Sequence, residues 1–182
     1  MRQLLYYSFL CLLALPAAAK EWQVTAGNSI ARAIKSAAAG DTVRVERGYY
    51  HEHIIINKPL KLIGVDRPTI SGDNLPGDVI HIRATDVQVE GFIVRDSGAD
   101  LTAQNAGIYI FPGSDRALIR NNDLIYTLFG LWIEKSKDVR IINNLITGKR
   151  DLQSSQRGNG IQLYNTTGAL ITDNNISFTR DG

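Results

Sequence analysis

Residues 130–146 read GLWIEKSKDVRIINNLI, and two neighbouring segments repeat this pattern. The earlier copy, residues 107–124, reads GIYIFPGSDRALIRNNDL, and the later copy, residues 160–176, reads GIQLYNTTGALITDNNI. The glycines that open successive copies are Gly107, Gly130, Gly160 and Gly182, at intervals of 23, 30 and 22 residues. A more divergent copy without the glycine occupies residues 80–92. A repeat with a period in the twenties predicts a solenoid.

Within each copy, apolar residues alternate with polar ones over short runs, which is the spacing of β-strands. Gly, Asn, Asp, Ser and Lys separate these runs, as expected of turns. A leucine-rich repeat would place a helix in each unit, and no copy contains a helical pattern of that length. We therefore expect an all-β fold, a single-stranded right-handed parallel β-helix with one copy per coil. Successive coils would lie ~4.8 Å apart, as neighbouring strands do in a sheet.

Asparagines recur at one position of the repeat. Alignment of the copies superimposes Asn122, Asn144 and Asn174. The position before them holds Asn121, Asn143 and Asp173, residue types that tolerate a left-handed bend. Stacked Asn side chains can hydrogen-bond to one another and to the turns above and below, which predicts a structural ladder. Simple turn composition would also place Asn here, but three copies in register favour the ladder.

The first 19 residues have the features of an export signal. Arg2 precedes an apolar run from Leu4 to Leu15, and Ala17-Ala18-Ala19 provides a cleavage site before Lys20. The run is too short to span a membrane. Cys11 has no small residue before it, so a lipoprotein signal is not favoured. After cleavage the chain contains neither Cys nor Met, and its stability would depend on its core.

The mature chain, residues 20–182, is expected to begin with a cap. Residues 29–39 are rich in helix formers, with an N-cap at Asn28 or Ser29 and Gly40 as terminator. This helix would cover the open apolar end of the solenoid, and the coils would begin at about residue 41. The last residues, 180–182, would open another copy, and no second cap is visible. Because open strand edges promote aggregation, we expect a fragment of a longer β-helix.

These motifs carry a family resemblance. They are the export signal, the cap helix, Ala39-Gly40-Asp41-Thr42-Val43, the run Gly48-x-Tyr50-x-Glu52-x-Ile54-x-Ile56-x-Lys58-Pro59-Leu60 and the Asn-Asn coils. Residues 20–182 thereby resemble the NosD family, periplasmic β-helix proteins required for maturation of nitrous-oxide reductase. The resemblance implies a periplasmic accessory protein without catalytic activity. The partners it implies are ABC transporter subunits, a copper chaperone and the reductase whose copper centres are assembled.

The opening motif is shared with other exported β-helix proteins. An exported carbohydrate-binding or polysaccharide-processing protein is therefore the alternative function. Enzymes of that kind need paired carboxylates or a carboxylate-bound Ca²⁺. The Asp residues of the coils are scattered, and we expect no catalysis. The formal net charge of +2, without a basic stripe, does not favour nucleic acid as a partner.

If the family handles copper directly, the ligands would lie in this chain, in the C-terminal coils of the longer β-helix that we expect, or on partners. Cu(I) prefers thiolate and thioether ligands, which the mature chain lacks. The only imidazoles are His51, His53 and His81. His51 and His53 are two residues apart on an expected strand and would share a face, so these three histidines are the candidate metal ligands. The simpler interpretation is solvated surface histidines.

Two surfaces are candidate binding sites. In the strands that follow the glycines, the outward positions carry Tyr109, Phe111, Trp132 and Glu134, with Phe129 adjacent. Outward aromatic side chains would form a flat surface for a sugar ring or a protein partner, or would simply stabilise the sheet. The connections before Gly107 and Gly160 are long, and we expect both to project from one corner. The second connection carries the candidate contact residues Lys149, Arg150, Asp151 and Arg157.

Overall fold

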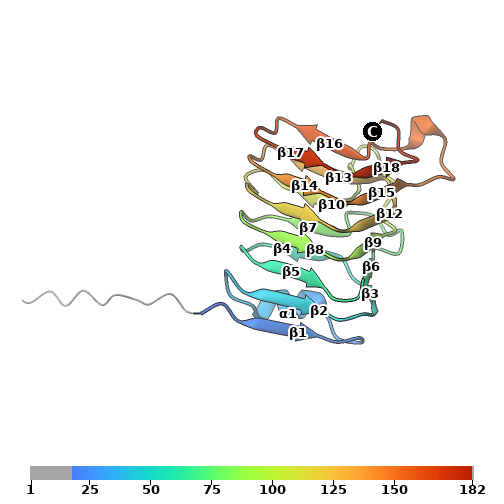
Figure 1. Cartoon of the computed structure of the whole chain (residues 1–182). Helices are drawn as coiled ribbons and strands as arrows, with labels where there is room; N and C mark the ends of the chain where they lie inside the picture. Colours follow the sequence, from blue (N-terminus) through green and yellow to red (C-terminus); the bar gives the residue numbers. More distant parts are fainter. Residues whose placement is uncertain (1–17, 182) are drawn as a thin grey trace, which may run out of the picture.

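The computed structural model describes residues 18–181, which wind into a stack of coils with a helix at one end (Figure 1). Three parallel sheets form the walls of the stack, and each coil contributes one strand to each sheet in turn. The expected parallel β-helix is confirmed. Residues 1–17 lie outside the described residues, so the expected signal segment stays a prediction.

Within the described residues, sheets A, B and C contain seven, six and five strands, because the helix follows the first strand where strands of sheets B and C would lie and because the last described strand belongs to sheet B. Sheet A contains β1 Glu21–Val24, β2 Thr42–Val45, β5 Lys61–Gly64, β8 Gln88–Glu90, β11 Leu118–Arg120, β14 Arg140–Ile142 and β17 Leu170–Thr172. Sheet B contains β3 Tyr49–His51, β6 Thr69–Ser71, β9 Ile93–Arg95, β12 Asp123–Thr127, β15 Leu145–Gly148 and β18 Asn175–Ser177. Sheet C contains β4 Ile54–Ile56, β7 Ile80–Ile82, β10 Ala106–Ile110, β13 Phe129–Glu134 and β16 Ile161–Tyr164.

The core is a column of aliphatic side chains inside the three sheets. In sheet C, Ile80, Ile108 and Leu131 stack in register, and all three are 0% exposed. Equivalent columns come from sheet A, with Ile119 and Ile141, and from sheet B. Since alternate residues of a strand point to opposite faces, the period-two pattern in the sequence places these side chains inward.

The Asn side chains form the expected ladder at the turn from sheet A to sheet B. Asn122 N and Nδ2 donate to Asn144 Oδ1 at 3.0 and 3.2 Å, and Asn144 N and Nδ2 both donate to Asn174 Oδ1 at 2.9 Å. The residues before them adopt left-handed backbone, with φ of 56° at Asn121 and 53° at Asn143. Each buried amide therefore satisfies turn backbone that would otherwise be unpaired.

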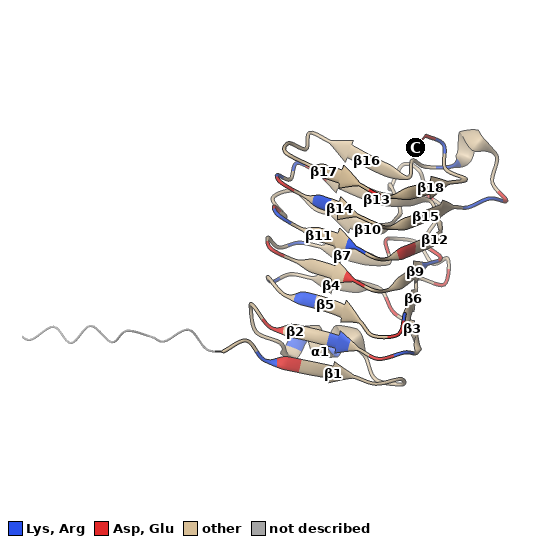
Figure 2. Cartoon of the chain, in the orientation of Figure 1, with Lys and Arg blue, Asp and Glu red and all other residues tan. Residues whose placement is uncertain are grey.

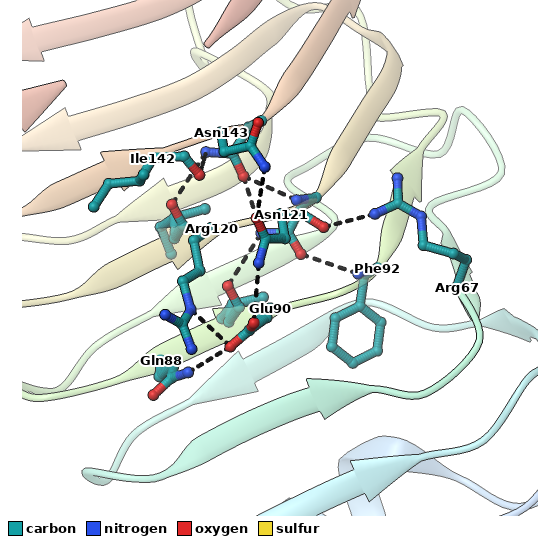
Figure 3. Close-up of polar contacts among 12 residues, drawn as sticks. Arg67, Gln88, Glu90, Phe92, Arg120, Asn121, Ile142 and Asn143 are labelled. Atoms are coloured by element: carbon teal, nitrogen blue, oxygen red, sulfur yellow. Dashed lines mark hydrogen bonds and ion pairs between the residues drawn. The ribbon is translucent and has the colours of Figure 1, made fainter. Parts of the chain in front are cut away.

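A second, partly exposed column accompanies the ladder. Asn143 Nδ2 donates to Asn121 Oδ1 at 2.8 Å, and Asn121 Nδ2 donates to Glu90 at 3.1 Å (Figure 3). Arg120 pairs with the same carboxylate at 2.8 Å, while Arg67 donates to Asn121 O at 2.7 Å. This corner is thus occupied by contacts within the chain.

The N-terminal cap is α1, Ile30–Ser36, with Ser29 as its N-cap residue. The helix is shorter than the expected 29–39. Ala37 is already extended, and Lys58 Nζ donates to the Ala37 carbonyl at 2.7 Å. At the other end, the Glu52 carboxylate accepts from two N–H groups of α1 at 2.9 Å each. A residue from the first coil thereby fixes the cap to the stack.

Positive and negative residues are interspersed along the stack. Figure 2 shows Lys and Arg interspersed with Asp and Glu on successive coils. Several pair between coils, for example Arg116 with Asp86 at 2.7 Å. Within residues 18–181, no helix has the length and hydropathy needed to cross a bilayer.

Candidate functional site: the loop edge

Two long connections leave the stack at one corner, where sheet B passes to sheet C. Residues 96–105 join β9 to β10, and residues 149–160 join β15 to β16 and include the short 3₁₀ helix η1, Ser154–Gln156. In the coil between them the same connection is the single residue Leu128. We call the two connections together the loop edge (residues 96–105 and 149–160). Its second part projects from the stack near the end of the chain (Figure 1).

The short connection at Leu128 lets the two long ones meet. Leu128 N donates to Ser97 Oγ at 2.9 Å, and Leu128 O accepts from Gly158 N at 3.2 Å. Lys149 is buried, and its Nζ donates to Asn74 Oδ1 at 2.6 Å. The loop edge is thus also tied to the turn between β6 and β7, and residues from separate coils form one unit.

The outward aromatic column exists, but it is not the exposed surface expected from the sequence. Tyr109 stands in register with His81 and Trp132, as expected, yet Tyr109 is 9% and Phe129 7% exposed. Leu101 and Leu152 of the loop edge pack against these rings. The expectation of a flat open surface was wrong for Tyr109 and Phe129, because the loops fold back over sheet C and bury these two rings in a second small core.

Two of the expected contact residues lie beside this covered region. Phe111 remains 37% exposed, and the Arg83 guanidinium lies 4.9 Å from its ring centroid. Glu134 accepts a hydrogen bond from the Tyr109 hydroxyl at 2.6 Å and pairs with Lys135 at 3.1 Å. The hydrogen bond from Tyr109 holds the pKa of Glu134 below its ordinary value. Glu134 is therefore committed to contacts within the chain.

The charged residues of the second loop hold its shape. Arg157 donates to Leu152 O at 2.8 Å and to Arg150 O at 3.0 Å. Asp151 accepts from the Tyr126 hydroxyl at 2.7 Å. Burial lowers the pKa of Lys149. These side chains give the loop a defined conformation, so its outer surface is presented by a rigid support.

Between the two parts of the loop edge lies an open groove of about 620 Å³. Apolar and amide side chains share its lining, with one carboxylate. The lining residues are Asn74, Pro76, Ala99, Asp100, Leu101, Asn105, Leu152 and Gln156. Volumes of this size, roughly 300–1,000 Å³, are those of ligand sites.

The three histidines do not come together as the metal site suggested by their spacing. The strand expected across residues 51–53 is broken, because β3 ends at His51 and β4 begins at Ile54 in a different sheet. His51 pairs with Asp73 at 2.7 Å, whereas His53 Nδ1 contacts the Asp78 carbonyl at 2.6 Å. No group of three or more His, Cys, Asp or Glu side chains in residues 18–181 is placed to hold a metal ion.

His81 instead forms a partly buried pair with Asp78. His81 Nδ1 lies 3.7 Å from Asp78 Oδ2, and its ring stacks on Tyr109 with centroids 4.9 Å apart. Burial raises the pKa of Asp78 to about 6. Burial, together with the positive charge of Arg83, lowers the pKa of His81 to about 4. The two shifts have opposite signs: folding favours the protonated form of Asp78 and the neutral form of His81.

Sequence reasoning located the corner but missed part of its lining. Asn74 and Pro76 belong to a separate turn, and nothing in the repeat links them to the two long connections. Leu101 and Leu152 are single apolar residues within polar segments. This pattern could have predicted their packing, because single apolar residues in long connections often form small clusters against the body of the protein.

Sequence comparisons relate this chain to two curated proteins. It is 34% identical over 139 residues to the "Probable ABC transporter binding protein NosD" of Stutzerimonas stutzeri, covering 76% of this chain and 32% of that protein. It is 33% identical over 135 residues to the protein of the same name from Pseudomonas aeruginosa, covering 74% and 31%. The chain thus spans about a third of the length of these relatives.

Solved structures match the fold. A pectin methylesterase in complex with a hexasaccharide aligns with a TM-score of 0.53 at 17% identity, over 82% of this chain and 66% of that one. A mutant of the enzyme with another hexasaccharide gives a TM-score of 0.54 at 18% identity and the same coverage. The model of the family described as "Right handed beta helix region" matches residues 78–182. This chain therefore belongs to the right-handed β-helix family and is a NosD-like member of it.

Proposed function

We propose that this chain is a periplasmic docking protein for an ABC transporter, acting without catalysis in the maturation of the copper centres of nitrous-oxide reductase. Its similarity to proteins named as probable ABC transporter binding proteins supports the association with a transporter. The signal-like residues 1–19 support export. The resemblance described above supports the link to the reductase and to a copper chaperone.

The loop edge is the observation that carries the docking role. Two long connections meet at one corner, pack on a shared apolar cluster and enclose a groove. Rigid loops on a regular scaffold are where binding residues concentrate in proteins. The loop edge therefore offers a shaped surface, whereas the outer face of sheet A is regular and charged.

We propose that residues 18–181 do not themselves bind copper and that the partners hold it. Soft sulfur ligands suit Cu(I), and the single Cys and the single Met fall at positions 11 and 1, in the signal-like segment. The histidines lie in different surroundings, as described above. The donor set of residues 18–181 does not fit a copper site.

Capture of the transporter tests the proposal. The full-length protein is immobilised, and the reconstituted transporter subunits are passed over it. Replacing residues 150–157 by four glycines and serines is expected to reduce capture at least tenfold. The control replaces Lys61 and Arg140, exposed on sheet A, by alanine and should retain capture. Equal capture by both variants, with unchanged circular dichroism, would contradict a docking role for the loop edge.

A further inference from the structure

The groove in the loop edge has a lining of distinct chemistry. Leu101, Leu152 and Pro76 supply branched or cyclic aliphatic surface. Amide groups come from Asn74, Asn105 and Gln156 on three different connections. Among the residues that line it, Asp100 alone carries a charge. The groove therefore suits a ligand with its own donors and acceptors, an aliphatic part, and neutral or positive charge.

Asn105 places a buried, oriented amide group in the groove lining. This residue is only 4% exposed, and its Oδ1 accepts from Asp100 N at 3.2 Å. That bond leaves Nδ2 as the free donor, and within the described residues Nδ2 makes no hydrogen bond and is not sealed from solvent. A methyl group on Gly98 would overlap Asn105 Oδ1. Only glycine at position 98 therefore leaves room for the Asn105 amide.

We infer that the groove binds an extended peptide segment of a partner protein, with an aliphatic side chain between Leu101 and Leu152. This inference rests on the proposed docking function. Each peptide unit presents one N–H and one C=O, and amide side chains pair with both. The charge of Asp100 complements a segment that is neutral or basic.

Other ligand classes fit the lining less well. A sugar ring stacks on a flat aromatic face, but the rings of Tyr109 and Phe129 are buried beneath the loops and do not line the groove. A phosphate or carboxylate ligand would need a cation; no Lys or Arg is among the lining residues, and the neighbouring Lys149 ammonium is already bonded to Asn74 Oδ1. The aliphatic and amide lining therefore favours a peptide.

Labelled peptides test this inference on the full-length protein. Overlapping 15-residue peptides that cover the exported segments of the transporter membrane subunit are titrated by fluorescence anisotropy. We expect at least one to bind, and both Leu152→Asn and Gln156→Ala to weaken binding at least tenfold. Gln156 is exposed, so its truncation leaves the fold intact. The matched control is Ser155→Ala, an exposed neighbour outside the groove lining, which should bind as the parent does.

The outcomes separate this inference from the docking proposal. If no peptide binds while the intact transporter is still captured, the groove inference fails and the docking function stands. If peptides bind equally to all variants, the groove is not their site and the inference fails. If the parent protein neither binds a peptide nor captures the transporter, both proposals are overturned. If a neutral oligosaccharide binds and peptides do not, and the same two variants weaken its binding, the peptide inference fails and the ligand of the groove is a glycan.

Discussion

Replacing Asn144 by alanine should strongly destabilise the solenoid. Asn144 Oδ1 accepts from Asn122 N and Nδ2, and Asn144 Nδ2 donates to the Ile119 carbonyl at 3.1 Å. Asn122 is 0% exposed and Asn144 2%, so water does not reach the Asn122 N–H groups and the Ile119 carbonyl that lose their partner. Each unsatisfied buried group costs about 1–3 kcal/mol, and two or three of them would cost about 3–5 kcal/mol.

The matched control is Asn143→Gly, one residue away. Asn143 is exposed, and its side chain makes one hydrogen bond, to Asn121. Its φ of 53° is readily adopted by glycine. We expect a loss of no more than about 1 kcal/mol, the net value of one exposed hydrogen bond.

Urea denaturation of both variants, followed by circular dichroism, measures the difference. For a chain of this size the larger loss corresponds to a fall in Tm of roughly 10 °C, at about 2–4 °C per kcal/mol. Because solenoids can unfold locally, amide exchange at residues 119–124 should accelerate in Asn144→Ala alone. If Asn144→Ala costs no more than Asn143→Gly, the buried amides do not hold the turns and the ladder argument is refuted.

Three other perturbations follow from the contacts. A methyl group at Gly130 would overlap the Gly160 carbonyl of the next coil, so Gly130→Ala should cost about 1–3 kcal/mol in urea denaturation; an unchanged midpoint would show that the coils can move apart. Glu52→Ala removes the carboxylate that caps α1 and should lower stability by about 1–2 kcal/mol, with helical signal lost first on heating. In the parent, the raised pKa of Asp78 favours the fold as pH falls from 6 to 4, while the lowered pKa of His81 opposes it, so the two effects largely cancel. Asp78→Asn removes the opposing effect of Asp78, so the free energy of unfolding of this variant should fall from pH 6.5 to pH 4 relative to the parent. Parallel pH profiles of the variant and the parent would contradict the partial burial of this pair.

The repeat architecture was readable from the sequence because each of its determinants is local and recurs. A strand position, its turn and its Asn occur within about one coil, and stacking places each on its counterpart in the next coil. Tyr109 beside Trp132 in register is one consequence that the aligned copies predicted correctly. The cap helix was also visible, although it ends earlier than expected, at Ser36, where Lys58 of the first coil donates to the carbonyls of Lys35 and Ala37.

The histidines show where local patterns mislead. His51 and His53 are two residues apart, and this spacing predicted that they share a face. The rule holds only along an unbroken strand. The chain turns a corner at residues 52 and 53, and Glu52 there is drawn to the N-terminus of α1. The alternation of apolar and polar residues does not predict this contact between Glu52 and α1, because the two are far apart in the sequence.

From the sequence alone came the period, the inward aliphatic columns, the Asn ladder and the resemblance to the NosD family, because these depend on residues that repeat or lie side by side along the chain. Only the tertiary structure decided that the loops cover the aromatic column and enclose a groove. That outcome depends on a one-residue connection at Leu128 lying between two long ones, and on Lys149 reaching Asn74 across 75 residues of sequence. Such contacts are set by how far each connection extends in space, which composition and periodicity do not specify.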